Sequence, residues 1–353
     1  MITKRPLKLS TGILAVTFIL HAGAAVAQED GGPRPLFAEH AVIEARIEAP
    51  LSTLTRDRPE EDYLEGTFSY RDSDGSEKRF SLELRTRGRY RRQKSTCNFP
   101  PVRLNFRTSE LSGTDFEGQD KLKLVTHCQT RRDRFEQLVL REYLAYRILE
   151  SLTDLSFRAR LMRITWVDTG GDEPFIRYGF VIEDDDDIGT RVGMQKVETK
   201  SLAYADLDPR QTNLVNVFEF LIGNTDFSLI RGPADDDCCH NAVPFSDGNL
   251  VRPIPYDFDF SGLVDAPYAE PNPQFKIRSV RTRLYRGRCS NNAILADTLA
   301  HVQGKRTDIY ALVDSLAGLD EKNRRQVTGY LDDFFEIVAN PELVEKRLIK
   351  ECS

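Results

Sequence analysis

Residues 219–262 read EFLIGNTDFSLIRGPADDDCCHNAVPFSDGNLVRPIPYDFDFSG. The apolar run at 213–222 predicts a helix that stops at Gly223, because glycine is the usual residue after a helix C-terminus. Beyond the insertion at 227–240, a short hairpin with an apolar second strand is expected. Four polar residues of this stretch are candidates for a site: the acids Asp226, Asp257 and Asp259 and the amide Asn241. The stretch therefore predicts a polar cluster held between a helix and a hairpin.

Kinase-type phosphotransferases place their base and metal ligands in this order along the chain: a helix, a loop acid, a loop amide and a strand-end acid. Asp226 suits a base beside a cleft, and Asn241 offers a neutral oxygen. Asp257 and Asp259 lie on one face of a strand end, where two acids repel unless a cation lies between them. Magnesium binds such carboxylate and amide oxygens. An isolated Asn-x-Asp is more often a turn, so only the whole set predicts phosphoryl transfer.

Working outward, alternating apolar and polar residues predict a first half that is largely an antiparallel sheet. The predicted strands are 41–47, 65–70, 78–85, 102–106, 122–125, 160–167 and 175–182. One long helix, 132–152, interrupts them. The second half is helical at 213–222, 292–303, 306–317 and 320–338. We therefore expect an α+β protein with an antiparallel-sheet N-lobe that contains one long helix, and a mainly helical C-lobe.

Glu142 projects into the apolar arc of the 132–152 helix. A carboxylate among apolar side chains is costly unless a cation meets it. Lys121 and Lys123, on the preceding strand, are the nearest candidates. Kinases use such a strand lysine and helix glutamate to hold the nucleotide phosphates. The alternative is that Glu142 simply lies at the edge of a crowded helix.

The N-terminus has the pattern of a secretory signal peptide over residues 1–27. A positive start is followed by the apolar run 12–20 and by Ala-Val-Ala at 25–27. An uncleaved membrane anchor is the alternative. No other stretch reaches membrane-spanning length, so we expect an exported protein, periplasmic or extracellular, with no membrane span after cleavage. The net charge of −6 argues against a nucleic-acid partner.

Six cysteines in an exported chain predict disulfides. We favour Cys97 with Cys128, and one of Cys238 or Cys239 with Cys289. Adjacent cysteines rarely bridge each other, so a Cys238–Cys239 bond is not expected. A metal site built from Cys238, Cys239 and His240 is the alternative, but no second ligand pair at zinc spacing accompanies it.

Residues 65–265 resemble the secreted kinase-like family of spore-coat protein CotH. The first-half motifs of that family have counterparts in Arg87-Gly88-Arg89, 122–125, Leu140-Arg141 and Gly179-Phe180-Val181-Ile182-Glu183. The second-half motifs, which are more specific, have counterparts in Asn224-Thr225-Asp226, Asn241 and Tyr256-Asp257-Phe258-Asp259. Two features depart from the pattern. Phe227-Ser228 follows the acid where Arg or Trp is frequent, and Asn241 lies fifteen residues after Asp226.

The resemblance implies a bilobal protein-kinase-like fold, with an N-lobe at 28–185 and a C-lobe at 186–353. It implies a kinase that transfers the γ-phosphate of ATP to Ser or Thr hydroxyls of a protein, with Mg²⁺ or Mn²⁺. Asp226 would be the base, and Asn241 and Asp257, or Asp259, the metal ligands. Lys121 or Lys123 would meet the phosphates, while Glu183 would border the adenine. The sequence has no Gly-x-Gly-x-x-Gly loop, so we expect the segment from Arg87 to Arg92 to cover the phosphates instead; the alternative is that these arginines form a solvated basic strand. The alternatives are a kinase-fold pseudoenzyme that only binds, and a phosphotransferase for sugars.

Overall fold

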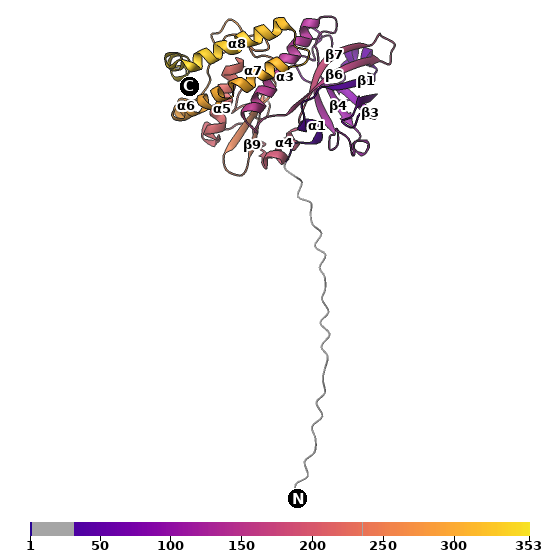
Figure 1. Cartoon of the computed structure of the whole chain (residues 1–353), viewed down its shortest axis with the longest axis horizontal. Helices are drawn as coiled ribbons and strands as arrows, with labels where there is room; N and C mark the ends of the chain where they lie inside the picture. Colours follow the sequence, from indigo (N-terminus) through magenta and orange to yellow (C-terminus); the bar gives the residue numbers. More distant parts are fainter. Residues whose placement is uncertain (2–31, 235) are drawn as a thin grey trace. The chain divides into compact units, whose positions relative to one another are not determined.

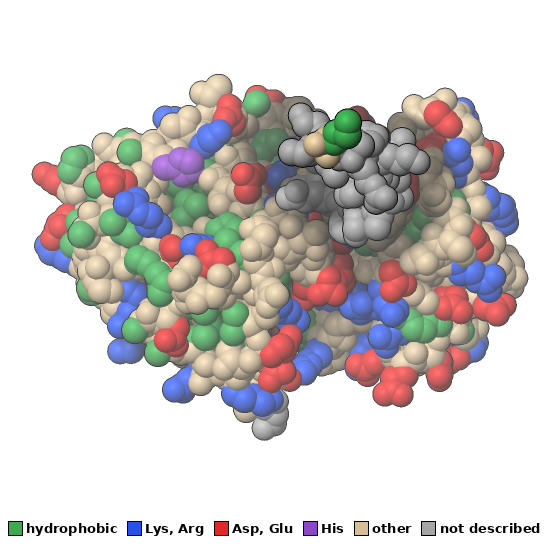
Figure 2. Space-filling view, turned by 90° about the horizontal axis from the view of Figure 1, so that it is seen from below, with side chains coloured by type: hydrophobic (Ala, Val, Ile, Leu, Met, Phe, Trp, Pro, Cys, Tyr) green, Lys and Arg blue, Asp and Glu red, His purple; other side chains and the backbone are tan. Residues whose placement is uncertain are grey.

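The computed structural model describes Met1, residues 32–234 and residues 236–353. The expected signal peptide, 1–27, lies outside the described residues except for Met1. Residues 31–353 form one compact unit. Among the described helices, none combines the length and the apolar character needed to cross a membrane. On the face shown in Figure 2, acidic and basic side chains are interspersed.

Seven strands form a closed barrel in the order β1-β2-β3-β4-β5-β7-β6. The strands are β1 Ile43–Ala49, β2 Leu64–Arg71, β3 Glu77–Thr86, β4 Val102–Phe106, β5 Lys121–Val125, β6 Ala159–Asp168 and β7 Phe175–Ile182. All neighbours are antiparallel except β1 and β6, which run parallel and close the barrel, with Ile43 opposite Met162.

The core of the barrel combines aliphatic and aromatic side chains. Phe68 is fully buried and lies edge-on to Phe106 and Phe116, with ring centroids 5.4 and 5.0 Å apart. Along β3, buried positions alternate with more exposed ones, as expected for a strand with one face on a core. This alternation in the sequence is why the strand positions could be predicted.

The expected bilobal kinase-like fold with an antiparallel-sheet N-lobe is wrong. The seven strands close into a mixed barrel, and helices lie around it. Alternation of apolar residues shows where a strand lies, but it carries no information about which strand is its neighbour. The alternation therefore could not predict the β1–β6 pair, which joins segments more than a hundred residues apart. The boundary at 185/186 stays a prediction.

The longer helices lie on one side of the barrel, and α3 (Asp133–Leu152) lies against it, in contact with β6, β7 and α7 (Figure 1). The other long helices are α5 Pro209–Ile222, α6 Asn292–Gly304, α7 Arg306–Ser315 and α8 Glu321–Ala339. Short helices are α1 Pro35–Ala38, α2 Leu51–Asp57, α4 Asp185–Val192 and α9 Pro341–Val344. A second small sheet contains β8 Gln195–Lys196, β9 Ala242–Ser246 and β10 Val251–Pro255, in the order β10-β9-β8.

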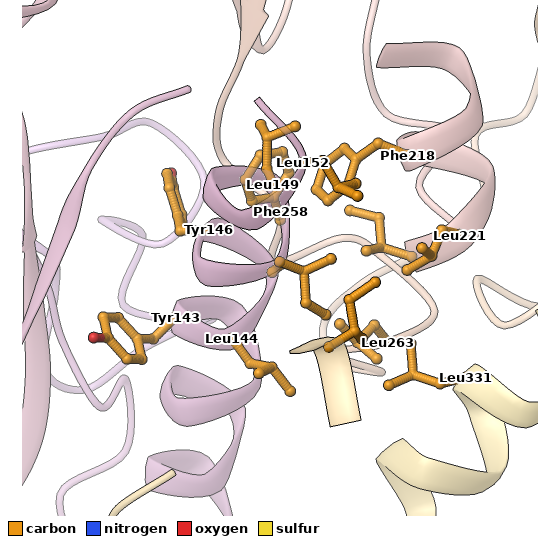
Figure 3. Close-up of a cluster of buried hydrophobic side chains, with 14 of the residues drawn as sticks. Tyr143, Leu144, Tyr146, Leu149, Leu152, Phe218, Leu221, Phe258, Leu263 and Leu331 are labelled. Atoms are coloured by element: carbon orange, nitrogen blue, oxygen red, sulfur yellow. The ribbon is translucent and has the colours of Figure 1, made fainter. Parts of the chain in front are cut away.

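A second hydrophobic core joins α3 to the helical half. Tyr146 and Leu149 of α3 lie in one cluster with Phe218 of α5, Phe258 and Leu331 of α8 (Figure 3). The ring of Phe258 is 4.7 Å from that of Tyr146 and 5.3 Å from that of Phe218. The chain after β10 is therefore anchored at a residue that lies between two acids, Asp257 and Asp259.

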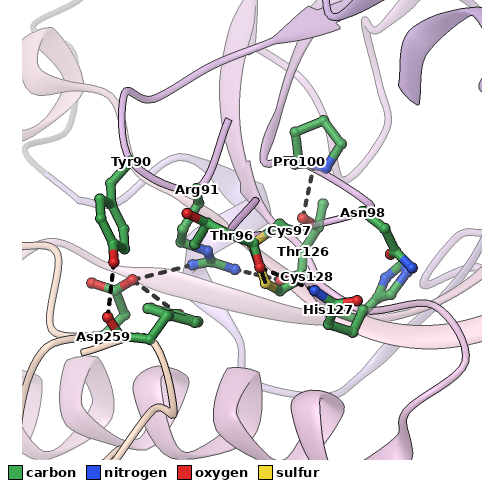
Figure 4. Close-up of a disulfide and its surroundings, with 12 residues drawn as sticks. Tyr90, Arg91, Thr96, Cys97, Asn98, Pro100, Thr126, His127, Cys128 and Asp259 are labelled. Atoms are coloured by element: carbon green, nitrogen blue, oxygen red, sulfur yellow. Dashed lines mark hydrogen bonds and ion pairs between the residues drawn. A yellow bond between two sulfur atoms is a disulfide. The ribbon is translucent and has the colours of Figure 1, made fainter. Parts of the chain in front are cut away.

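Three disulfides connect the six cysteines. Cys97 is bonded to Cys128, as expected, with Cα atoms 4.6 Å apart (Figure 4). The expected bond from Cys238 or Cys239 to Cys289 is wrong, because the adjacent cysteines are bonded to each other. Cys289 is bonded to Cys352, since the C-terminal residues return to it and its N–H donates to the Ser353 carbonyl. With both sulfurs in a bond, the alternative metal site at 238–240 is also wrong.

Candidate functional site

The C-terminus of α5 places Asp226. Gly223 adopts the left-handed conformation, with φ of 67°, and its N–H donates to the Glu219 carbonyl. The Asn224 N–H donates to the same carbonyl at 2.8 Å. The Asp226 N–H then donates to the Asn224 side-chain oxygen at 2.9 Å. These local bonds end the helix and turn the chain, so Asp226 lies in the loop directly after the helix cap, half-buried.

Asn241 and Asp257 lie at the two open ends of the β9–β10 hairpin. The Tyr256 N–H donates to the Asn241 carbonyl at 3.0 Å, so the two ends lie side by side. Both residues adopt left-handed φ values, 52° for Asn241 and 64° for Asp257. Asn and Asp are among the few non-glycine residues that adopt this conformation regularly. The Asp257 N–H donates to the Tyr146 hydroxyl of α3 at 2.9 Å, which ties the hairpin to the barrel side.

The Asp226 carboxylate is contacted at both oxygens. The His240 Nε2 lies 3.0 Å from Oδ1, and the Asn241 Nδ2 donates to Oδ2 at 3.2 Å and to the Asp226 carbonyl at 2.6 Å. The hydrogen bond with Asp226 raises the pKa of His240. Sequence reasoning treated His240 only as a possible metal ligand. Its position directly before Asn241 was the available signal for a place in this group.

A buried ion network contains Arg91 and Asp259 (Figure 4). The Arg91 guanidinium is 3.4 Å from the Glu142 carboxylate and 3.8 Å from that of Asp259. The Tyr268 hydroxyl also donates to Asp259, at 3.0 Å. Burial, followed by the charge of Asp259, raises the pKa of Glu142 well above its usual value. Burial and the charge of Asp257 raise the pKa of Asp259 to about 7.

The expected cation for Glu142 was therefore wrong. Glu142 is buried, with 2 % exposure, but Arg91 meets it instead of Lys121 or Lys123. Lys123 donates to Asp185 at 2.9 Å. Lys121 is exposed, and its nearest acid is the adjacent Asp120, at 3.6 Å. Arg91 comes from the loop after β3, which no local pattern could place against α3.

Glu183, expected beside an adenine, is fully buried. Arg191 of α4 donates to both of its oxygens, at 2.9 and 2.8 Å, and the Arg158 N–H adds a third bond at 3.1 Å. This carboxylate is thus satisfied within the protein and connects α4 to the barrel.

A cavity of about 690 Å³ collects most of the remaining site residues. On the barrel side its wall is the segment 87–91. On the other side the wall holds the polar cluster of Asp226, His240, Asn241, Asp257 and Asp259. Apolar side chains line a further part of the wall: Pro101, Val125, Ile182, Val243 and Tyr256. Asp185 and Lys196 line it as well, their side chains 3.3 Å apart. Lys121, Lys123, Glu142 and Glu183 are not part of its wall.

Within the described ranges, no group of three or more His, Cys, Asp or Glu side chains has the arrangement of a metal site. The oxygens that could hold a divalent cation are those of the Asp257 carboxylate and the Asn241 side chain. The Asn241 Nδ2 makes the contacts with Asp226, so its side-chain oxygen is available. Burial and then repulsion from Asp257 raise the pKa of Asp259, and a cation between the two carboxylates would relieve that repulsion. The donor set fits Mg²⁺ or Mn²⁺ by its chemistry.

A scan of known protein families finds no match for the chain, and a search of curated proteins finds none either. The resemblance to the CotH family stays a prediction that rests on the motifs quoted above.

Proposed function

We propose that this chain is an exported phosphotransferase of the CotH type that transfers the γ-phosphate of ATP to Ser or Thr hydroxyls of a protein. One observation supports this above all. An acid, an amide and a second acid, Asp226, Asn241 and Asp257, line the same cavity as two arginines, Arg87 and Arg91. Phosphoryl transfer needs a base, hard oxygens for a divalent cation, and positive charge on the phosphates. The cavity supplies residues of each kind.

Asp226 is the residue we propose as the base. Its carboxylate is half-buried and lines the cavity, so an acceptor hydroxyl can reach it and transfer its proton to a carboxylate oxygen. Asn241 and Asp257 would hold Mg²⁺ or Mn²⁺, which when bound neutralises charge on the phosphates. The two left-handed residues occupy fixed backbone positions at the hairpin ends, and such preorganised donors avoid reorganisation during the reaction.

On the barrel side, Arg87 is the predicted phosphate-binding residue that lines the cavity. Its guanidinium can bind two phosphate oxygens at once. The apolar side chains of Pro101, Val125, Ile182 and Val243 line the same cavity and offer an apolar surface suited to a nucleobase. Three disulfides favour an oxidising compartment, which supports export.

Nucleotide binding without transfer is the second candidate. The observation that favours it is that both oxygens of the Asp226 carboxylate already have partners, His240 and Asn241. A base that must accept a proton has fewer free lone pairs when it is bonded in this way. In this case the chain would bind ATP with a metal ion and serve as an interaction protein.

Labelled phosphate incorporation separates the two. The mature chain is incubated with γ-labelled ATP and Mg²⁺ or Mn²⁺, with generic protein and sugar acceptors. Asp226→Ala should lower incorporation by about 100-fold or more, the usual effect of losing a positioned acid–base group. Asp257→Ala should also lower incorporation, because it removes a proposed metal ligand. Asp333→Ala, at an exposed site on α8, is the matched control. Incorporation that survives both site substitutions would refute the mechanism. Metal-dependent thermal stabilisation by ATP without incorporation would support binding alone.

A further inference from the structure

Residues 227–240, which separate Asp226 from Asn241, return the chain to its starting point. The Ser228 N–H donates to the His240 carbonyl at 2.9 Å, and the His240 N–H donates to the Ser228 carbonyl at 3.1 Å. The Cys238 N–H is held by the Thr199 carbonyl at 2.8 Å. The two ends of the segment are therefore fixed side by side. This places the His240 side chain next to the residue that precedes the segment, Asp226.

The backbone around Asp226 is held by a different residue. Arg286 donates from one nitrogen to the Thr225 carbonyl at 3.1 Å and to the Phe227 carbonyl at 2.5 Å. These bonds fix the chain on both sides of Asp226, but they do not touch its carboxylate. The terminal torsion of an aspartate has a broad distribution when nothing restrains it. Orientation of the carboxylate plane is thus left to His240 and Asn241.

An ionised carboxylate can only accept hydrogen bonds. The contact of 3.0 Å between Nε2 and Oδ1 therefore requires the hydrogen to be on Nε2, which assigns the imidazole as the donor. Asn241 donates to the other oxygen. The two neighbours act on opposite oxygens, and removal of either releases rotation of the carboxylate.

We propose that His240 is a positioning residue for Asp226, which fixes the carboxylate plane through the Nε2–Oδ1 bond. The proposal rests on the role of Asp226 as the base. It gives the 227–240 segment a function in the site, as the element that carries this donor. Misplacement of a reacting group by about 1 Å can cost about 100-fold in rate, so loss of the bond should affect kcat. The KM for ATP should change little, because His240 acts through Asp226.

The test compares His240→Ala, His240→Gln and His40→Ala with the wild type in the labelled-ATP assay. His40, whose side chain is 39 % exposed, lies outside the cavity wall and is the control. We expect His240→Ala to lower kcat about 10- to 100-fold with a KM for ATP within about twofold of wild type. The Gln side chain can donate from its own Nε2, so His240→Gln should recover a substantial part of kcat. Added imidazole should do the same in His240→Ala.

Three results would overturn the proposal. A kcat of His240→Ala within about twofold of wild type, with Asp226→Ala inactive, would remove the role of His240 and leave the phosphotransferase intact. Loss of kcat that neither Gln nor imidazole restores would show that His240 only stabilises the fold. A wild type that incorporates no label would refute the proposed function itself, and the role of His240 with it.

Discussion

Replacement of Glu219 by Gln should stabilise the protein at neutral pH. Glu219 lies on the buried face of α5, with 1 % exposure. Neither oxygen of its carboxylate has a hydrogen-bond partner among the residues that the structure describes. Burial raises the pKa of Glu219 to about 8, so the folded protein keeps this side chain neutral at pH 7. Gln is a neutral side chain of nearly the same shape.

The magnitude follows from proton linkage. The pKa in the folded state lies above that of the unfolded chain, about 4.5, so unfolding releases a proton between pH 4.5 and 8. The free energy of unfolding of the wild type therefore falls with rising pH in this window, by up to about 1.4 kcal/mol per pH unit. Between pH 4.5 and pH 7 the loss sums to about 3 kcal/mol. Glu219→Gln has no such proton to lose.

Urea unfolding at several pH values between 4.5 and 8 measures this difference. The advantage of Glu219→Gln over the wild type should be small at pH 4.5 and grow to about 3 kcal/mol at pH 7. Glu336→Gln, at an exposed position of α8, should follow the wild type throughout. A difference between Glu219→Gln and the wild type that stays constant with pH would refute the reasoning.

Three further predictions follow from the same structure. Burial lowers the pKa of His127 to about 3, so the folded protein becomes less stable as pH falls below about 6.5, where the unfolded chain binds a proton at this residue. In urea unfolding, His127→Phe should reduce the loss of unfolding free energy between pH 7 and pH 5 by about 2 kcal/mol. Arg91→Met leaves two buried carboxylates without their cation, and should lower the free energy of unfolding by about 3 to 5 kcal/mol. Lys123→Met removes the ion-pair partner of Asp185, an acid in the cavity wall, and should weaken ATP binding about tenfold. Calorimetry measures this change, and Lys121→Met should not show it.

Local patterns predicted the elements of this fold but not their arrangement. The alternation at 78–85 and 160–167 corresponds to β3 and β6 within one or two residues, because a half-buried strand needs that alternation. Closure of the barrel depends on the β1–β6 pair, and this contact is set by three-dimensional packing. The expected kinase-like fold was wrong for this reason.

Part of the candidate site could also be predicted from local sequence patterns. Asp226, Asn241 and Asp257 flank a helix end and a hairpin, so short-range structure brings them to one cavity. The need of Glu142 for a cation was also evident from its apolar neighbours. That the cation is Arg91 could not be predicted, since a loop from the far end of β3 supplies it.

Barrel closure has a consequence for self-association. A strand with an open edge can pair with a strand of another molecule and begin aggregation. Among the described strands, each of the seven in the barrel has a neighbour on both sides. The open edges belong to the small sheet, where β8 has two residues and β10 carries Pro253 and Pro255, which have no N–H to donate. The strands that the structure describes therefore offer no long open edge at which fibril-type pairing between folded molecules could begin.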